Sequence, residues 1–344
     1  MRTISLTLMV VTATACSVQH WQSASVPPVD EHMAHMMAAD MDAPAATRAS
    51  GRFVNGSSQG APGLPASNES AAARLGASPR HGEWVKVAWG PGSADSLMAW
   101  IVYPVRSGKA PVVVVVHEIF GLSTWVRAVT DQLAAQGYIA IAPDILSRVR
   151  GGPSSVELSG NDARNMIGRV PDADRYRTAV NAAANYAMTQ PSALARYAVI
   201  GFCWGGTTVW GHAIDGGVQG FAAGVAYYGA PPYSTGGQSA TPSTPATPVS
   251  PSRDSLAKIR VPILLLNGAR DARIGTQMPA IDSAMRALGK VYAGVNYDGA
   301  IHGFLRAQDD PATGANADAG AANLAAARDA WPRTVSFLRQ HLGP

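Results

Sequence analysis

The sequence predicts an α/β fold, a doubly wound and mostly parallel sheet with helices on both faces. Residues 112–116 form an uninterrupted β-branched run, which is typical of a parallel strand buried on both faces. After this run, short apolar stretches alternate with longer amphipathic ones, as in successive βαβ units. The chain has 344 residues, 47% of them hydrophobic, so it is long enough to form one sizeable core.

Each expected element has its own local signal. Residues 85–89 and 97–103 have the pattern of an opening antiparallel pair of strands. Residues 125–136 are amphipathic and stop at a glycine, and residues 173–188 follow an aspartate, so both are predicted helices. The other expected strands are residues 138–142, 197–201, 221–228, 261–267 and 291–297, and the other expected helices are residues 278–288 and 321–341.

The first 16 residues have the pattern of an export signal. A charged start at Arg2 precedes an apolar run at 4–11 and small residues at 13–15. The apolar run is shorter than the roughly 20 residues that a membrane-spanning helix needs. Cys16 stands where a bacterial lipoprotein signal is cut, and it is the predicted lipidation site. We therefore expect an exported protein, either periplasmic or anchored to a membrane by lipid.

Residues 17–81 are predicted to form a disordered, low-complexity tether, because they hold too little periodic apolar surface to offset chain entropy. Within it, His32, Met33, His35, Met36 and Met37 cluster, but without an ordered scaffold we interpret them as linker and not as a copper site. The catalytic domain is then expected at 82–344. Residues 234–252, rich in Ser, Thr, Pro and Gly, are predicted to be a surface insertion loop.

The charge pattern argues against nucleic-acid binding. The net charge of +4 and the isoelectric point near 9.2 come from scattered arginines, with no basic run and no interleaved aromatic residues. A mild positive charge suits acidic small molecules. We expect a monomer that acts on a small-molecule substrate.

The run Gly-Phe-Cys-Trp-Gly at 201–205 follows a predicted strand and opens a predicted helix. It has the pattern of a nucleophile elbow that carries cysteine, with glycines where strand and helix must approach closely. With Cys16 lipidated or removed, Cys203 is the one thiol left, so an intramolecular disulfide is excluded. A buried, inert thiol is the alternative interpretation.

Two further residues stand directly after consecutive predicted strands. Asp271 follows the strand at 261–267, and His302 follows the strand at 291–297. In parallel sheets, functional side chains gather at the carboxyl ends of strands. The order Cys203, Asp271, His302 is that of nucleophile, acid and base in hydrolytic triads on such sheets. Asp298 is a competing acid, but it lies on the same loop as the histidine.

Together these motifs resemble the dienelactone hydrolase family, the carboxymethylenebutenolidase-like branch of the α/β-hydrolase superfamily. The resemblance rests on His-Glu-Ile-Phe-Gly at 117–121, Gly-Phe-Cys-Trp-Gly-Gly at 201–206, Ala-Tyr-Tyr-Gly at 226–229 and the loops carrying Asp271 and His302. It spans residues 82–342 in unbroken order. It implies an α/β-hydrolase fold with one catalytic domain.

The resemblance also implies the catalytic roles. Cys203 is the expected nucleophile, His302 the general base and Asp271 the acid that orients it. Glu118 is the carboxylate expected to partner the cysteine at rest and to take the thiol proton when substrate binds. The expected oxyanion hole consists of the backbone N–H groups of Ile119 and Trp204.

Substrate binding is expected from arginines and a tyrosine. Arg306 matches a family arginine that binds a substrate carboxylate, a task suited to a guanidinium. Arg164 is the candidate for a second such arginine, with Arg148 or Arg150 as alternatives, and Tyr228 is a third substrate-binding candidate. No metal or organic cofactor is expected.

The predicted function is cysteine-dependent hydrolysis of small lactones or carboxylic esters through an acyl-thioester. Two alternatives stay open at this stage. One is a broader exported esterase or acyl hydrolase, whose larger substrates depend on how the 234–252 insertion shapes the pocket. The other is a non-enzymatic exported binding protein on the same fold.

Overall fold

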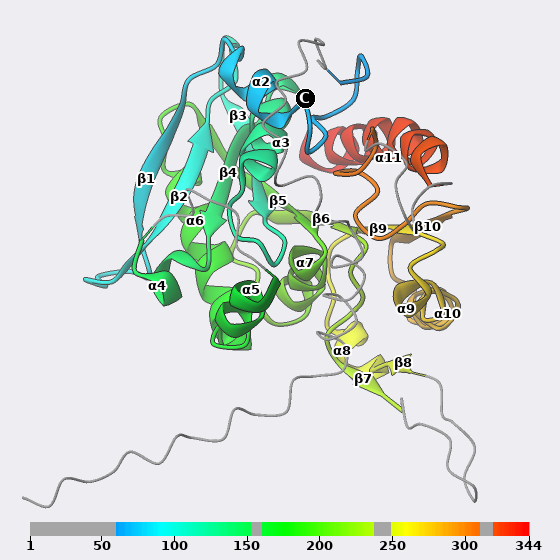
Figure 1. The fold of residues 1–344 in the computed structure, drawn as a ribbon. Coiled ribbons are helices and arrows are strands. Elements are labelled where there is room, and N and C mark those ends of the chain that lie inside the picture. The colour runs from blue at the N-terminus through cyan, green and yellow to red at the C-terminus, as the bar shows by residue number, and fades with distance from the viewer. Residues whose placement is uncertain (1–59, 153–159, 237–248, 310–318, 344) are drawn as a thin grey trace, which may run out of the picture.

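The computed structural model describes residues 60–152, 160–236, 249–309 and 319–343, and its centre is one eight-stranded sheet (Figure 1). The strand order is β1-β2-β4-β3-β5-β6-β9-β10. This confirms the predicted α/β fold. The strands are β1 (Gly82–Ala88), β2 (Ser96–Val102), β3 (Ala110–Val116), β4 (Ile139–Asp144), β5 (Ala193–Phe202), β6 (Phe221–Tyr227), β9 (Ile263–Gly268) and β10 (Tyr292–Tyr297).

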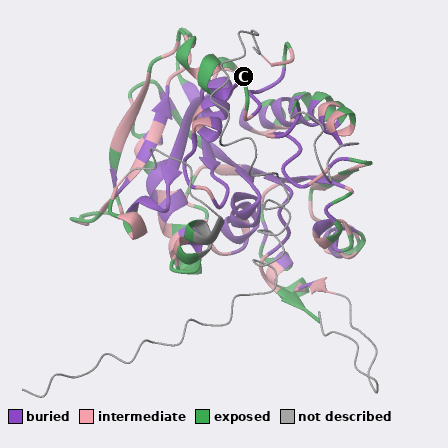
Figure 2. Ribbon diagram, in the orientation of Figure 1, coloured by how far each residue is buried: buried purple, intermediate pink, exposed green. Residues whose placement is uncertain are grey.

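Antiparallel pairing is confined to one edge of the sheet. β1 pairs antiparallel with β2, and β2 pairs antiparallel with β4. The remaining neighbours pair in parallel, so β3, β5, β6, β9 and β10 end on the same side. All seven residues of β3 are buried, as the continuous valine run predicts for a strand covered on both faces. Figure 2 shows this burial continuing through the central strands.

Helices pack against the sheet as the periodicity predicts. α3 begins at the Ser123 cap, whose hydroxyl accepts the N–H of Val126 at 3.4 Å. α6 packs on β3 and β4, α7 on β5 and β6, and α11 on β6 and β9. The longer helices are α3 (Thr124–Ala135), α6 (Ala179–Met188), α7 (Trp204–Asp215), α10 (Met278–Ala287) and α11 (Gly320–Leu342), and the shorter ones are α2 (Ala71–Gly76), α4 (Ser147–Arg150), α5 (Gly160–Ile167), α8 (Arg253–Ala257) and α9 (Ala272–Gly275).

The predicted helix over 173–188 starts with a π-helical turn. This turn, η2 (Asp174–Thr178), runs directly into α6. A π turn inserts one extra residue and so changes which side chain faces the core. The π turn cannot be predicted from apolar periodicity, because that pattern is compared with the 3.6-residue repeat of the α-helix.

Residues 60–81, which fall within the predicted tether, pack against the domain that holds the sheet. We call residues 60–78 the N-terminal arm. Within it, Leu64 and Ala66 are buried. The carbonyl of Ala66 accepts the indole N–H of Trp125 at 2.8 Å. The arm is poor in large apolar residues, but its backbone groups find partners on the domain, which composition does not show. The rest of the predicted tether, and Cys16, lie outside the described residues.

The ends of the predicted 234–252 insertion pair with each other. β7 (Ser234–Thr235) and β8 (Ser250–Pro251) form a two-stranded antiparallel sheet that projects from the main body in Figure 1. The residues between 237 and 248 lie outside the described part of the chain. Across the described helices, none has both the length and the apolar character needed to cross a bilayer.

Candidate active site

Cys203 occupies a sharp turn between β5 and α7. Its backbone lies at φ 56° and ψ −115°, a region that a residue with a side chain seldom adopts, and its thiol is buried. A Cβ at position 201 would collide with the carbonyl of Gly205, and one at position 205 would collide with the carbonyl of Val116. Both glycines are therefore required by close backbone approach, as the elbow motif predicts.

His302 and Asp271 meet at the end of the sheet. The Nδ1–H of His302 donates to Oδ2 of Asp271 at 2.6 Å, and both side chains are buried. The other carboxylate oxygen accepts the N–H of Ile274 at 3.4 Å, so Asp271 also caps α9. Asp298, the competing acid, is exposed. The structure thus pairs the histidine with the aspartate preferred from strand order.

The electrostatics of this pair favour an imidazolium. Burial opposes the charged ring, but the charges of Cys203 and Asp271 and the hydrogen bond to Asp271 raise the pKa of His302 well above its usual value. For Asp271, burial favours the neutral acid, yet His302 and Arg273 outweigh it and lower the pKa. The arrangement can therefore hold a protonated histidine between the Asp271 carboxylate and the Cys203 sulfur.

Glu118 and Arg306 form a second charged pair in the same region. Arg306 Nε lies 3.1 Å from Glu118 Oε2, and its guanidinium sits 5.3 Å from the centre of the Phe120 ring. Glu118 is buried at the end of β3. After burial, the charges of Glu118, Arg306 and Cys203 are the next largest effects on the pKa of Tyr228, so these groups lie near its hydroxyl.

Tyr228 is held directly beside the histidine. Its ring centre lies 5.0 Å from that of His302, and its backbone has φ 39°. The side chain is fully buried, and its hydroxyl makes no hydrogen bond with any described residue. Burial is the main reason that the pKa of Tyr228 lies well above its usual value, so the hydroxyl keeps its proton. It is therefore a donor available to a bound molecule.

The two residues predicted to form the oxyanion hole come from adjoining elements. Ile119 lies on the loop after β3, and Trp204 is the first residue of α7, whose N–H has no partner within the helix. Both are buried. Close packing of Gly205 against the backbone of Val116 and His117 brings the helix start to this loop.

The other predicted arginines have different surroundings. Arg148 is paired with Asp95 at 3.0 Å and Asp174 at 3.7 Å, and its guanidinium lies 4.0 Å from the Trp89 ring centre. The Arg164 side chain lies outside the described part of the chain. Arg148 borders a cavity of about 210 Å³, whose lining is Trp89, Ile145, Arg148, Val149, Arg169, Val170, Pro171 and Asp174.

Arg175 is a functional candidate that sequence reasoning missed. It is buried in the π turn, with its guanidinium 4.6 Å from the Trp204 ring centre and 4.5 Å from that of Tyr176. Its ion-pair contact with Asp172 is long, 4.0 Å. Burial lowers the pKa of Arg175, while Tyr176, Asp172 and Cys203 act in the opposite direction. Nothing in the local sequence distinguishes this arginine from a surface one.

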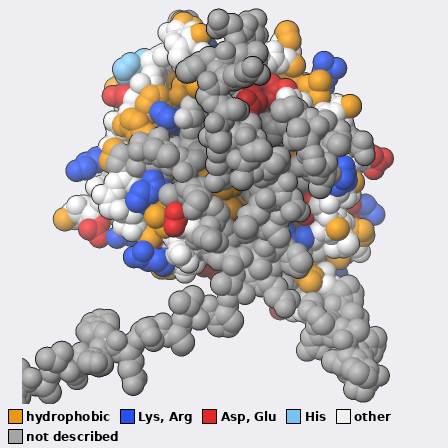
Figure 3. All heavy atoms as spheres, in the orientation of Figure 1, with side chains coloured by type: hydrophobic (Ala, Val, Ile, Leu, Met, Phe, Trp, Pro, Cys, Tyr) orange, Lys and Arg blue, Asp and Glu red, His pale blue; other side chains and the backbone are white. Residues whose placement is uncertain are grey.

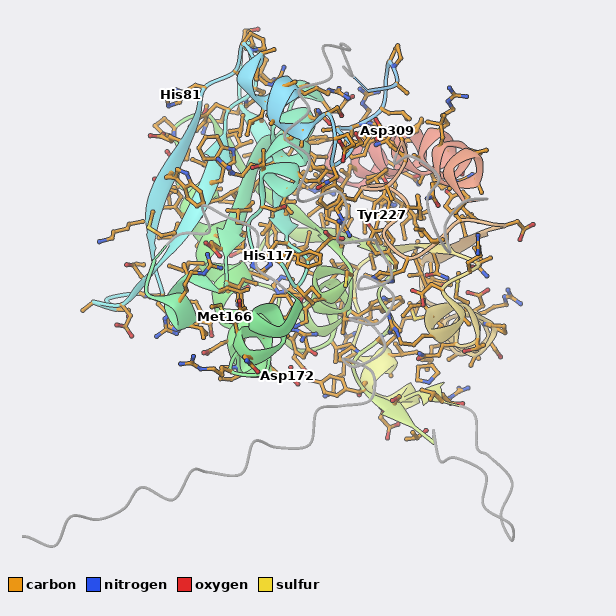
Figure 4. The ribbon with its side chains drawn as sticks, in the orientation of Figure 1. His81, His117, Met166, Asp172, Tyr227 and Asp309 are labelled. Atoms are coloured by element: carbon orange, nitrogen blue, oxygen red, sulfur yellow. The ribbon has the colours of Figure 1, made fainter. Side chains whose placement is uncertain are left out.

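The N-terminal arm holds the loop that follows His302. The backbone N–H of Asn68 donates to the carbonyl of Arg306 at 2.9 Å. Gln308 Nε2 donates to the carbonyl of Pro65 at 3.1 Å, and the Ser67 hydroxyl donates to Asp309 at 2.8 Å. Figure 4 labels Asp309 beside this arm. Residues far apart in sequence therefore support the site together.

The described surface carries charges of both signs, and the described side chains form no metal-binding group. On the face in Figure 3, described Lys and Arg side chains occur at separate positions with Asp and Glu between them. Within the described ranges, no group of three His, Cys, Asp or Glu side chains is placed to hold a metal ion.

Comparison with known proteins agrees with this geometry. The model of the dienelactone hydrolase family matches residues 97–342. An Escherichia coli (strain K12) protein named "Putative carboxymethylenebutenolidase" is 30% identical over 256 residues, 74% of this chain and 86% of its own length. A Bradyrhizobium sp. protein named "Probable 2-oxo-3-(5-oxofuran-2-ylidene)propanoate lactonase" is 29% identical over 262 residues, covering 76% and 94% of the two chains.

A solved structure shows the same architecture. The "Putative Dienelactone Hydrolase" of Klebsiella pneumoniae superposes with a TM-score of 0.56 at 26% identity, over 76% of this chain and all of that one. The family match and the coverage of its relatives show the family of this chain. The chain is therefore a hydrolase of small-molecule carboxylic esters that belongs to the dienelactone hydrolase family.

Proposed function

We propose that this enzyme hydrolyses small lactones or esters that carry a carboxylate, with Cys203 as nucleophile. One observation carries the proposal: the His302 ring is held by Asp271 at 2.6 Å and lies near the Cys203 sulfur, whose charge is among the causes that raise the pKa of His302. A thiol beside a protonated histidine is a stronger nucleophile at neutral pH than an isolated one.

The reaction runs through an acyl-thioester. The Cys203 thiolate attacks the carbonyl carbon, and the carbonyl electrons move to oxygen, where the N–H groups of Ile119 and Trp204 stabilise the charge. Collapse of this intermediate breaks the carbon–oxygen bond, and the leaving alkoxide takes a proton from His302. The neutral histidine then removes a proton from water as that water attacks the thioester. Cys203 leaves as thiolate and takes back the proton held by Glu118, which restores the resting enzyme.

The Glu118–Arg306 pair supports a requirement for an anionic substrate. At rest, Arg306 is engaged by the Glu118 carboxylate at 3.1 Å. A substrate carboxylate on the same guanidinium competes with Glu118 for it. The released glutamate can then take the thiol proton, so that the nucleophile becomes active when the correct substrate is present.

Arg175 and the name of the Bradyrhizobium relative also support a substrate that carries a carboxylate. Arg175 is a buried cation, and within the described residues its ion-pair contact is a long one to Asp172, so an anion bound beside it would satisfy its charge. The Bradyrhizobium relative is named for a lactone that bears a propanoate group. We therefore assign Arg306 and Arg175 to the substrate carboxylate, and the Tyr228 hydroxyl to a polar substrate atom.

The test compares the full chain with its Cys203→Ala variant on anionic lactones, anionic enol esters and neutral aryl esters, with catalytic efficiency recorded for each. Cysteine-dependent turnover that favours the anionic lactones supports the proposal. A preference for neutral esters contradicts the substrate class. Undiminished turnover by Cys203→Ala contradicts the nucleophile, provided that circular dichroism shows both proteins to be folded.

A further inference from the structure

We infer that His117 is a positioning residue that fixes both backbone donors of the oxyanion hole, an inference that rests on the proposed function. His117 follows β3, is fully buried and lies in the interior of the molecule (Figure 4). Its Nε2 lies 3.1 Å from the backbone nitrogen of Ile145, and its Nδ1 lies 2.6 Å from the carbonyl oxygen of Glu118. Both ring nitrogens are thus bonded to main-chain groups.

These partners define the tautomer of the ring. A backbone N–H can only donate, so Nε2 of His117 must accept from Ile145. The proton of the neutral ring therefore sits on Nδ1 and is donated to the Glu118 carbonyl. Burial is the largest effect on the ring and lowers the pKa of His117; Asp144 opposes this and Arg150 adds to it. The ring accordingly stays neutral at physiological pH.

This bond sets the direction of the Ile119 N–H. The carbonyl of Glu118 and the N–H of Ile119 belong to one peptide unit, and the described chain contains no cis peptide bond. In a planar trans peptide these two groups point in opposite directions. Anchoring the carbonyl to His117 therefore turns the amide away from the imidazole. The N–H of Gly121 donates to the same carbonyl, but at 3.3 Å, so the imidazole makes the shorter bond.

The same ring also supports the second donor. The rings of His117 and Trp204 are stacked, with centres 5.5 Å apart and planes inclined by 15°. Trp204 supplies the other predicted oxyanion N–H, and the Arg175 guanidinium also lies over its ring. One imidazole therefore links the loop after β3, the start of α7 and, through Ile145, the end of β4. A preorganised oxyanion hole requires that its donors be fixed relative to one another.

His212 provides a matched control. It too is fully buried with both ring nitrogens engaged, by the Tyr197 hydroxyl at 2.9 Å and the Tyr176 carbonyl at 2.7 Å. It lies on α7 and contacts no residue to which we assign a part in the reaction. A substitution there removes the same kind of buried polar ring and tests the purely structural effect.

The experiment uses the full chain and the variants His117→Phe, His117→Gln and His212→Phe. We expect His117→Phe to lower kcat by about tenfold or more, since loss of an oxyanion donor costs roughly 10²–10³ and misalignment somewhat less. KM and the rate of Cys203 alkylation by iodoacetamide should stay near the wild-type values. His117→Gln, whose amide can accept from Ile145 and donate to Glu118, should recover most of kcat. His212→Phe should lower Tm but not kcat.

Three results overturn the inference: unchanged kcat in His117→Phe, a loss confined to KM, or a glutamine variant no better than phenylalanine. If His117→Phe does not fold, His117→Asn is judged by the same criteria, because its shorter amide cannot reach both partners. Cys203→Ala is assayed alongside. Activity in that variant would contradict the proposed nucleophile, whereas an inactive Cys203→Ala with a fully active His117→Phe contradicts the positioning role alone.

Discussion

The backbone N–H of Asn68 donates to the carbonyl oxygen of Arg306 at 2.9 Å, which joins the N-terminal arm to the loop that carries His302. Gln308 and Ser67 add two further hydrogen bonds between arm and loop. The position of Arg306 opposite Glu118 therefore depends on residues that precede the sheet.

Removal of the arm should weaken both stability and activity. A chain of residues 82–344 loses the three hydrogen bonds between arm and loop and others, such as that from Trp125 to Ala66. Since each is worth about 1 kcal/mol, we expect its free energy of unfolding to fall by more than about 3 kcal/mol relative to a chain of residues 60–344. Its KM for anionic substrates should rise because Arg306 is less well held. Urea denaturation and steady-state kinetics measure the two effects. Equal stability and KM in the two chains would show that the arm does not support the site.

The pKa of His302 should depend on both of its charged neighbours. Cys203 and Asp271 raise it, so Cys203→Ala and Asp271→Asn should each bring the pKa down toward the usual histidine value. Titration of the ring resonances by NMR measures this shift. The His212 resonance serves as control, since its pKa of about 4 arises from burial. An unchanged His302 titration in Cys203→Ala would contradict the proposed interaction between Cys203 and His302.

Arg175→Met should separate binding from stability. We expect catalytic efficiency toward anionic lactones to fall about tenfold, or 1.4 kcal/mol, more than toward neutral esters. The free energy of unfolding should be unchanged or higher, because a buried cation with a 4.0 Å ion contact is replaced by an apolar side chain. Arg148→Met, which removes an arginine paired with Asp95, is the control and should not alter substrate preference. Equal losses on both substrate classes would count against a role in carboxylate binding.

Gly205→Ala should be strongly destabilising. The added methyl group would collide with the main-chain carbonyls of Val116 and His117, which cannot move without distorting β3. Overpacking of this kind costs about 1–3 kcal/mol or more. Gly90→Ala is the control, because a methyl group added at that position would meet no atom within 4 Å. Thermal unfolding compares the two, and similar Tm values would show that the elbow tolerates a side chain.

Stability should fall in mild acid because of buried neutral histidines. Burial lowers the pKa of His212 to about 4, so between the usual histidine value and about 4 the unfolded chain binds a proton that the folded chain does not. The free energy of unfolding then decreases as pH falls through this window, by up to about 3 kcal/mol for this residue. His117 acts in the same direction. To isolate the contribution of His212, the free energy of unfolding is measured against pH for wild type and for His212→Gln. Equal slopes in the two proteins would contradict a contribution from His212.

Much of the site could be predicted because local sequence reports it directly. Cys203, Asp271 and His302 each stand just after a strand-like run, and parallel strands end on the same side of a sheet. The elbow glycines can also be predicted from local sequence, because the backbone needs glycine where a strand turns sharply into a helix. The export signal, Cys16 and the expected monomer stay predictions.

The sequence by itself determined the fold class, the order of the elements and the identity of the triad candidates, because periodicity and turn residues act over a few neighbouring positions. Only the tertiary structure decided which distant groups meet: Arg306 with Glu118, Asn68 with the Arg306 carbonyl, and Arg175 with the Trp204 ring. The physical reason is that such pairings depend on how separate elements pack. A π turn or a docked, weakly apolar arm leaves no periodic trace in the residues that form it.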